Sequence, residues 1–151
     1  QVAVIEFARN VLHLEGAHSR EMDRRTPHPV IDIMESQKKV SGKGGTMRLG
    51  LYPCKIKPGY KISDVYSTDL INERHRHRYE FNNKYIEMFA MAGMQPVGIN
   101  PNEDLVEIVE LTNHPWFIGV QFHPEYRSTV ENPHPLFVRF VKAALEQSQA
   151  K

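Results

Sequence analysis

The sequence has 151 residues, of which 40% are hydrophobic and 25% are charged. These proportions are typical of a globular domain and exclude a disordered or collagen-like chain. Nineteen basic residues against eighteen acidic ones give a net charge of +1. The chain therefore lacks the strong positive field that holds nucleic acid or an anionic membrane surface. We expect one domain, or a piece of one, with no nucleic-acid partner and no membrane partner.

Apolar stretches and cysteine content bear on the cellular compartment. Stretches such as residues 2–5 and 117–120 are far too short to span a bilayer, and no signal peptide opens the chain. The single cysteine, Cys54, excludes an internal disulfide and fits a reducing compartment. We therefore predict a cytoplasmic protein. Because the chain begins at Gln1, with neither an initiator methionine nor a capping residue, we also expect a truncated chain.

The first half of the chain predicts one helix followed by two strands. Residues 1–15 place apolar residues at helical spacing and predict an amphipathic helix. Residues 29–34 are typical of a short strand, and residues 35–45 of a surface loop. Residues 46–57 alternate as a strand does, and Pro53 is expected to limit that strand to a sheet edge or to its first half.

The second half alternates strands with helices. Residues 64–72 are predicted as a short helix and residues 84–92 as an amphipathic helix ended by Gly93. We expect strands over residues 74–81, 95–99, 105–111 and 116–122, and a closing helix over residues 135–147 with proline in its first turn. This alternation favours an α/β sandwich with antiparallel edge strands.

The segment 121–125, Gln-Phe-His-Pro-Glu, follows an apolar strand and carries the clearest chemical signal. Residues two apart in a strand point to the same side, so His123 and Glu125 can project together. An imidazole beside a carboxylate is the base and the orienting partner of a nucleophilic site. For so short a motif, the alternative is an exposed turn at the end of a strand.

A run of alternating arginine and histidine gives a second signal. Arg74, Arg76 and Arg78 share one face of the predicted strand, where like charges repel unless an anion lies among them. Arg78 is then a candidate to bind a ligand carboxylate with two parallel hydrogen bonds. The alternative is a solvated edge strand whose arginines pair with surface acids.

Two further kinds of site are weighed against these. His75 and His77 permit a metal site, although no acidic or cysteine ligand lies nearby at a suitable spacing, so structural histidines are favoured. Cys54 follows a proline within a strand pattern, without the glycine-rich turn or helix N-terminus that activates a thiol. A buried structural cysteine is therefore expected.

Taken together, four segments resemble the glutaminase domain of the CTP synthase family. His-Pro-Glu alone resembles class I glutamine amidotransferases in general, and the other segments narrow the resemblance to CTP synthase. The resemblance implies the class I glutamine amidotransferase fold, an α/β fold with a mixed, mainly parallel central sheet flanked by helices, and with the N-terminal part of the domain missing. The segments are Gly-Gly-Thr-Met-Arg-Leu-Gly (44–50), Glu-Arg-His-Arg-His-Arg-Tyr-Glu (73–80), Asn-His-Pro-Trp-Phe (113–117) and Gln-Phe-His-Pro-Glu (121–125).

The resemblance also implies roles for particular residues. His123 would be the base for a nucleophilic cysteine, and Glu125 would orient His123. Gln1, Glu21 and Arg78 fall where the family contacts glutamine, with Glu21 suited to its α-amino group and Arg78 to its α-carboxylate. The segment from Gln1 resembles the continuation of the family's cysteine turn, so that the cysteine would lie four residues before Gln1. No metal site is implied in this chain.

The resemblance extends to function and partners. Residues 1–151 would be the C-terminal portion of a glutaminase domain that releases ammonia from glutamine, and the isolated chain is expected to be inactive. An amidoligase domain outside this chain would use ATP and Mg²⁺ to aminate UTP to CTP, with GTP as activator. The chain itself would carry no cofactor, and the intact enzyme would be a cytoplasmic homotetramer. The alternatives are the glutaminase domain of another synthetase, such as GMP synthetase, and a non-catalytic amidotransferase-like binding module.

Overall fold

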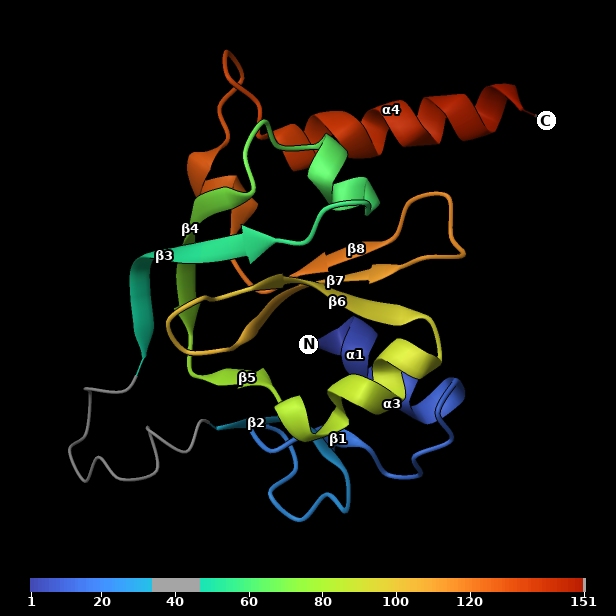
Figure 1. Ribbon diagram of the computed structural model, residues 1–151. Helices are drawn as coiled ribbons and strands as arrows, with labels where there is room; N and C mark the ends of the chain where they lie inside the picture. Colours follow the sequence, from blue (N-terminus) through green and yellow to red (C-terminus); the bar gives the residue numbers. More distant parts are fainter. Residues whose placement is uncertain (34–46, 151) are drawn as a thin grey trace.

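The computed structural model describes residues 1–33 and 47–150, and in it the strands form two sheets (Figure 1). The larger sheet has five strands in the order β4-β3-β6-β7-β8, and the smaller has three in the order β1-β2-β5. The strands are β1 (His18–Ser19), β2 (Pro29–Ile33), β3 (Arg48–Ile56), β4 (Leu70–His77), β5 (Tyr79–Phe81), β6 (Met94–Ile99), β7 (Val106–Leu111) and β8 (Ile118–Val120). The helices are α1 (Val2–Asn10), α3 (Ile86–Met91) and α4 (Pro135–Gln149), with 3₁₀ turns η1 (Lys61–Asp64), η2 (Asn83–Tyr85) and η3 (Pro124–Arg127).

Two apolar cores hold the helices and the two sheets together. In one, α1 buries Phe7 and Ala8 against the smaller sheet, and the Phe7 ring stacks on Phe89 of α3 with centroids 5.4 Å apart. The other lies around the larger sheet and includes Cys54, Ile108 and residues of η1 and α4. In Figure 1, α1, α3 and the smaller sheet lie below the larger sheet and α4 lies above it.

Most of the predicted elements are confirmed, with shifted ends. The first helix stops at Asn10, and the chain then turns through His13, whose φ of 55° is incompatible with a helix. Helix α3 is preceded by the turn η2 and followed by Gly93 at a φ of 99°, as expected for a residue that ends a helix. Helix α4 begins with Pro135 in its first turn and reaches Gln149. The predicted loop over residues 35–45, and the adjoining residues 34 and 46, lie outside the described residues.

The helix predicted over residues 64–72 is wrong. A 3₁₀ turn ends at Asp64, and strand β4 already begins at Leu70. In β4 the side chains alternate between exposed and buried, with Ile71 and Glu73 turned inward, and the strand pairs with β3 along its whole length. Strand pairing therefore outweighs the polar composition that resembled a short helix.

Strand β3 is not shortened by its proline. It runs from Arg48 to Ile56, and Pro53 pairs in register with Asn72 of β4. On its other side β3 pairs with β6 only at Lys55 and Ile56. At Pro53 the strand is therefore an edge on that side, where a missing N–H costs no ladder hydrogen bond.

The expectation of a mainly parallel sheet does not describe these strands. Among the described residues only β1 and β2 pair in parallel, and the larger sheet is antiparallel throughout. Short connections account for part of this arrangement, since parallel neighbours need a crossover of a dozen or more residues. β6 and β7, for example, are joined by residues 100–105 alone.

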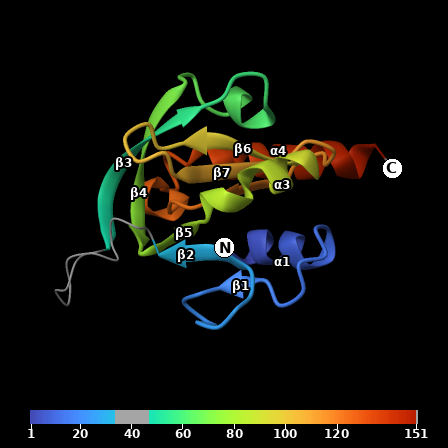
Figure 2. The same cartoon turned by 60° about the horizontal axis from the view of Figure 1, so that its bottom comes forward.

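The larger sheet curls strongly, which positions the site (Figure 2). β4 and β7 are separated by two strands in the sheet order, yet His75 and Glu107 approach to 3.5 Å. The chain leaving β8 also returns to β4, where the amide of His123 donates to the carbonyl of Arg74 at 2.9 Å. The segment after β8 therefore joins the two edge strands of the larger sheet, β8 and β4, at this point. No helix among the described residues has the length and apolar character needed to cross a membrane.

Candidate active site

His123 and Glu125 lie where the chain leaves β8 and enters the turn η3. Nδ1 of His123 is 2.7 Å from Oε1 of Glu125, and the turn η3, which begins after His123 and contains Glu125, brings the two side chains together. The imidazole also stacks on the ring of Tyr126, with centroids 4.9 Å apart and planes at 21°. The backbone bond to Arg74, the carboxylate and the tyrosine ring thus hold the imidazole from three directions.

The hydrogen bond between the two side chains determines which imidazole nitrogen of His123 faces Glu125. Slight burial works to raise the pKa of Glu125, but hydrogen bonds from His123 and from its own backbone outweigh this and lower it. An ionised carboxylate can only accept a hydrogen bond, so Nδ1 of a neutral His123 carries the proton. The lone pair is then on Nε2, which is the arrangement of a base with an orienting acid.

A cavity of about 550 Å³ opens beside His123, within the range usual for small-molecule sites. Four of the five residues singled out in the sequence line it, although they come from distant parts of the chain. Glu125 does not line it and lies behind His123. The four are Gln1 at the start of α1, Glu21 after β1, Arg78 between β4 and β5, and His123.

Arg78 is one of two arginines that line this cavity, the other being Arg76. Arg78 is half-buried, and its Nε is shielded from solvent without a hydrogen-bond partner among the described residues. Arg74 and Arg76 lie on the exposed face of β4, so the shared arginine face predicted for this segment is confirmed within the strand. Arg78 lies past the end of β4, where the chain bends toward β5. An unpaired guanidinium nitrogen in a cavity favours an anionic ligand.

Further residues that position the site were not found from the sequence. Gln121 donates from Nε2 to the carbonyl of Tyr79 at 2.8 Å and so ties the His123 segment to the strand after Arg78. Behind the cavity, Arg48 is buried and pairs with Glu80 at 3.0 Å and Glu107 at 2.8 Å. In the sequence, Glu107 resembled an ordinary outward-facing residue of an apolar strand.

The histidines of β4 point inward, opposite to its arginines. His75 and His77 are both largely enclosed, and burial together with nearby Arg48 lowers the pKa of His75 to about 3. Burial also raises the pKa of Glu107 to about 7, against the lowering effect of Arg48. The carboxylate missing from the sequence-based metal hypothesis is therefore present, contributed by a strand some thirty residues further along.

Cys54 is not part of the cavity. It is fully buried in β3, within the second apolar core, and burial raises its pKa to about 12. A thiol with this pKa is almost entirely protonated at neutral pH and is a poor nucleophile. The prediction of a buried structural cysteine is confirmed.

Comparisons with known proteins agree with this geometry. The family model for class I glutamine amidotransferases matches residues 1–143, and the chain belongs to that family. The resemblance to CTP synthase is also confirmed. The chain is 64% identical over 148 residues to a CTP synthase of Christiangramia forsetii, and 62% identical over 151 residues to one of Cytophaga hutchinsonii. These alignments cover 98% and 100% of the chain but only 27% and 28% of the two relatives.

One solved structure shows the same fold. It is the glutaminase domain of a Trypanosoma brucei CTPS with bound acivicin, which superposes with a TM-score of 0.89 at 36% sequence identity. The match covers 97% of this chain and 57% of the solved chain. The chain therefore corresponds to part of a glutaminase domain of this kind.

Proposed function

We propose that this chain provides the general base and most of the glutamine-binding surface of a glutaminase site. The observation that carries the proposal is the cavity, which brings Gln1, Glu21, Arg78 and His123 together from four separate segments. Glutamine has an α-carboxylate, an α-ammonium group and a neutral amide. The cavity offers a cation, an anion and a base, one suited to each of these groups.

Arg78 is proposed to bind the α-carboxylate, because its buried Nε has no partner among the described residues. Glu21 is proposed to bind the α-ammonium group, and Gln1 to contact the bound glutamine. The amide then lies toward His123, whose Nε2 has its lone pair available. A charge-assisted hydrogen bond contributes about 1.5–3 kcal/mol, so the two charged contacts fix the orientation of the amino acid.

In the proposed reaction, His123 removes the proton from a cysteine thiol that attacks the glutamine amide carbon. The same proton passes to the departing nitrogen, which leaves as ammonia, and a glutamyl thioester remains. Water then hydrolyses the thioester to glutamate and regenerates the thiol. Because Cys54 is buried with a raised pKa, the nucleophile is proposed to come from outside this chain, four positions before Gln1. The isolated chain is accordingly proposed to be inactive.

By similarity to the CTP synthases, the released ammonia is proposed to aminate UTP to CTP at an amidoligase domain outside this chain. ATP and Mg²⁺ would act in that domain and GTP as an activator, and we assign none of them to residues of this chain. A cytoplasmic homotetramer is part of the same proposal. What supports it is the high identity to CTP synthases over nearly the whole chain.

The test uses the native protein that carries this chain, assayed with glutamine and separately with ammonium salts. His123→Ala should lower glutamine-dependent CTP formation by at least about 10²-fold, the usual contribution of a general base. Arg78→Ala should raise the KM for glutamine about 10–100-fold, as expected from loss of one charge-assisted contact. Ammonia-dependent CTP formation should stay unchanged in both variants.

Arg24→Ala is the matched control, since Arg24 is exposed and does not line the cavity. Equal loss with both nitrogen donors would contradict the role given to His123. Release of glutamate without amination of UTP would favour the glutaminase of another synthetase. Absence of any glutamine hydrolysis by the native protein would favour a non-catalytic binding module.

A further inference from the structure

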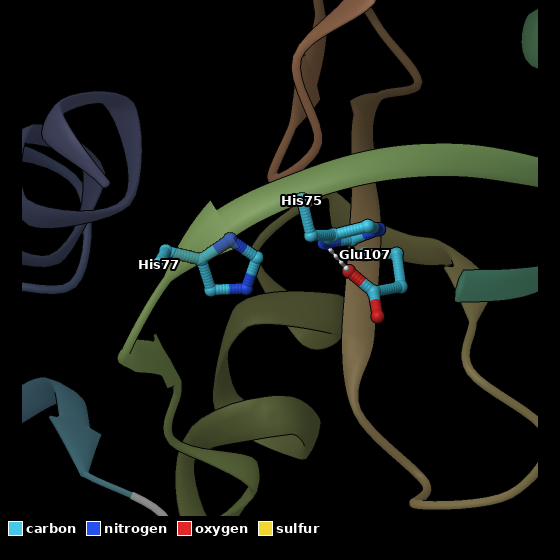
Figure 3. Close-up of side chains that lie close together, drawn as sticks. All are labelled: His75, His77 and Glu107. Atoms are coloured by element: carbon cyan, nitrogen blue, oxygen red, sulfur yellow. Dashed lines mark ion pairs between the residues drawn. The ribbon is translucent and has the colours of Figure 1, made fainter. Parts of the chain in front are cut away.

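A second group of side chains adjoins the cavity, which one of its members, His77, also lines, and Figure 3 shows the group in close-up. His75 and His77 project from β4 toward Glu107 of β7, and one ligand atom from each residue lies within 4.8 Å of the others. Nδ1 of His75 is 3.5 Å from Oε2 of Glu107. The curl of the sheet brings together two strands that are not neighbours in the sheet order.

The polar atoms of this group are not satisfied by the protein around them. Both ring nitrogens of His75, Nδ1 of His77 and Oε2 of Glu107 are buried and lack a hydrogen-bond partner among the described residues, whereas Oε1 of Glu107 pairs with Arg48 at 2.8 Å. Folded proteins leave few such atoms, because each one has lost its water without replacement. Four together indicate that something else binds in this space.

We propose that His75, His77 and Glu107 form a buried binding site for a divalent transition-metal ion of the zinc type. Two imidazoles and a carboxylate form a donor set that Zn²⁺ takes in proteins, with a fourth position left for water. Mg²⁺ and Ca²⁺ prefer oxygen ligands alone, so two of the three donors disfavour them.

The distances fit this ion after a small adjustment. Bonds of about 2.0–2.1 Å in a tetrahedron place two ligand atoms about 3.4 Å apart. The separation of 3.5 Å between His75 and Glu107 already meets this condition. Closing the remaining span of up to 4.8 Å needs a movement of about 1 Å, which a change in side-chain torsion angle supplies.

The residues around the three donors orient them. Nε2 of His77 is 2.8 Å from Oε1 of Glu80, and an acceptor there fixes the proton on Nε2 and leaves Nδ1 with its lone pair. Metal-binding histidines are typically oriented by a carboxylate in this way. Arg48 in turn holds Glu80 at 3.0 Å and Oε1 of Glu107 at 2.8 Å, so Oε2 of Glu107 remains available.

The local charge favours a divalent cation. Glu80, Glu107 and Glu103 surround the single guanidinium of Arg48, which leaves two negative charges in excess when the three carboxylates are ionised. A bound Zn²⁺ balances this charge.

The probe is Co²⁺, because tetrahedral Co²⁺ absorbs visible light and Zn²⁺ does not. The native protein that carries this chain is stripped with a chelator and titrated with Co²⁺. The variants His77→Gln and Glu107→Gln each remove one donor, and His114→Gln, an exposed histidine outside the group, is the matched control. The variant His123→Ala tests whether the ion binds in the cavity beside His123 and not at this group.

We expect the wild type, His114→Gln and His123→Ala to bind one tetrahedral Co²⁺ per chain that Zn²⁺ displaces. His77→Gln and Glu107→Gln should bind it at least tenfold more weakly. Glu80→Gln keeps all three donors and should weaken binding about tenfold through loss of orientation. Circular dichroism establishes that each variant is folded.

Wild-type protein without a tetrahedral Co²⁺ signal would overturn the proposal, whatever the variants do. The group would then be a closed cluster of hydrogen bonds in which Glu107 is protonated or a water bridges the side chains. A signal that persists in folded His77→Gln and Glu107→Gln would also overturn it, because the ion would then lie elsewhere. Loss of the signal in His123→Ala alone would place the metal in the cavity.

Discussion

Gly98 of β6 is the position where a single added methyl group should do the most damage. Its backbone has no positive φ, so the requirement is for space and not for conformational freedom. A Cβ at this position would lie 2.5 Å from Cγ1 and 2.7 Å from Cδ1 of Ile108, and 2.8 Å from Sγ of Cys54. Ile108 and Cys54 are fully buried, so neither side chain can move aside into solvent.

The loss of stability in Gly98→Ala can be estimated from these distances. Carbon atoms pack best about 3.5–4.0 Å apart, so Gly98→Ala creates overlaps of about 1 Å with two residues at once. Overpacking a core typically costs about 1–3 kcal/mol, and we expect the upper end of that range. For a domain of this size, about 3 kcal/mol lowers Tm by roughly 6–12 °C.

The assay is calorimetric unfolding of the native protein that carries the chain. Gly119→Ala is the matched control, because its Cβ would meet only Cγ2 of Val109, at 3.0 Å, and should cost less than about 1 kcal/mol. Combining Gly98→Ala with Ile108→Val removes the Cδ1 overlap, so the double variant should lose less stability than the sum of the two single changes. A Gly98→Ala protein as stable as wild type would refute the packing argument.

Two further predictions concern the chemistry of the chain. Glu125→Gln keeps the size of the side chain but removes the charge that fixes the proton on Nδ1 of His123. The glutamine-dependent kcat should therefore fall about 10²–10⁴-fold, with little change in the KM for glutamine or in ammonia-dependent turnover. A rise in KM alone would argue against an orienting role. Cys54 should resist iodoacetamide in the folded protein and react after denaturation, as measured by mass spectrometry, because it is buried and its pKa is raised to about 12. The variant Cys54→Ala should retain glutamine-dependent activity. A loss of that activity in folded Cys54→Ala would mark Cys54 as the nucleophile.

Local features of the site could be predicted from the sequence because they depend on spacing alone. His123 and Glu125 are only two residues apart, so their side chains could be expected near each other, although the structure brings them together in the turn η3 and not in a strand. The strand period in β4 predicts arginines on one face and histidines on the other. What each face meets was not predictable, since that depends on how the sheet curls.

Glu107 shows why the rest could not be predicted. In the segment Val-Glu-Ile-Val-Glu-Leu of β7, a glutamate between apolar residues is typical of a strand with one face in water. The structure buries β7 on both faces, so Glu107 and Glu110 both need partners. Glu110 accepts from the amides of Lys61 and Ile62, and Glu107 pairs with Arg48. All these partners are far away in the sequence.

The alternation in β4 also makes this strand sensitive to its register. Deletion of one residue between Arg74 and His77 would exchange the two faces of the strand beyond the deletion, turning arginines into the interior and histidines toward solvent. Arg78, which lies past the end of β4, would shift by one position as well. Insertions and deletions in β4 should therefore be far more harmful than side-chain substitutions on its outer face, because one slip would displace Arg78 and the buried histidines together.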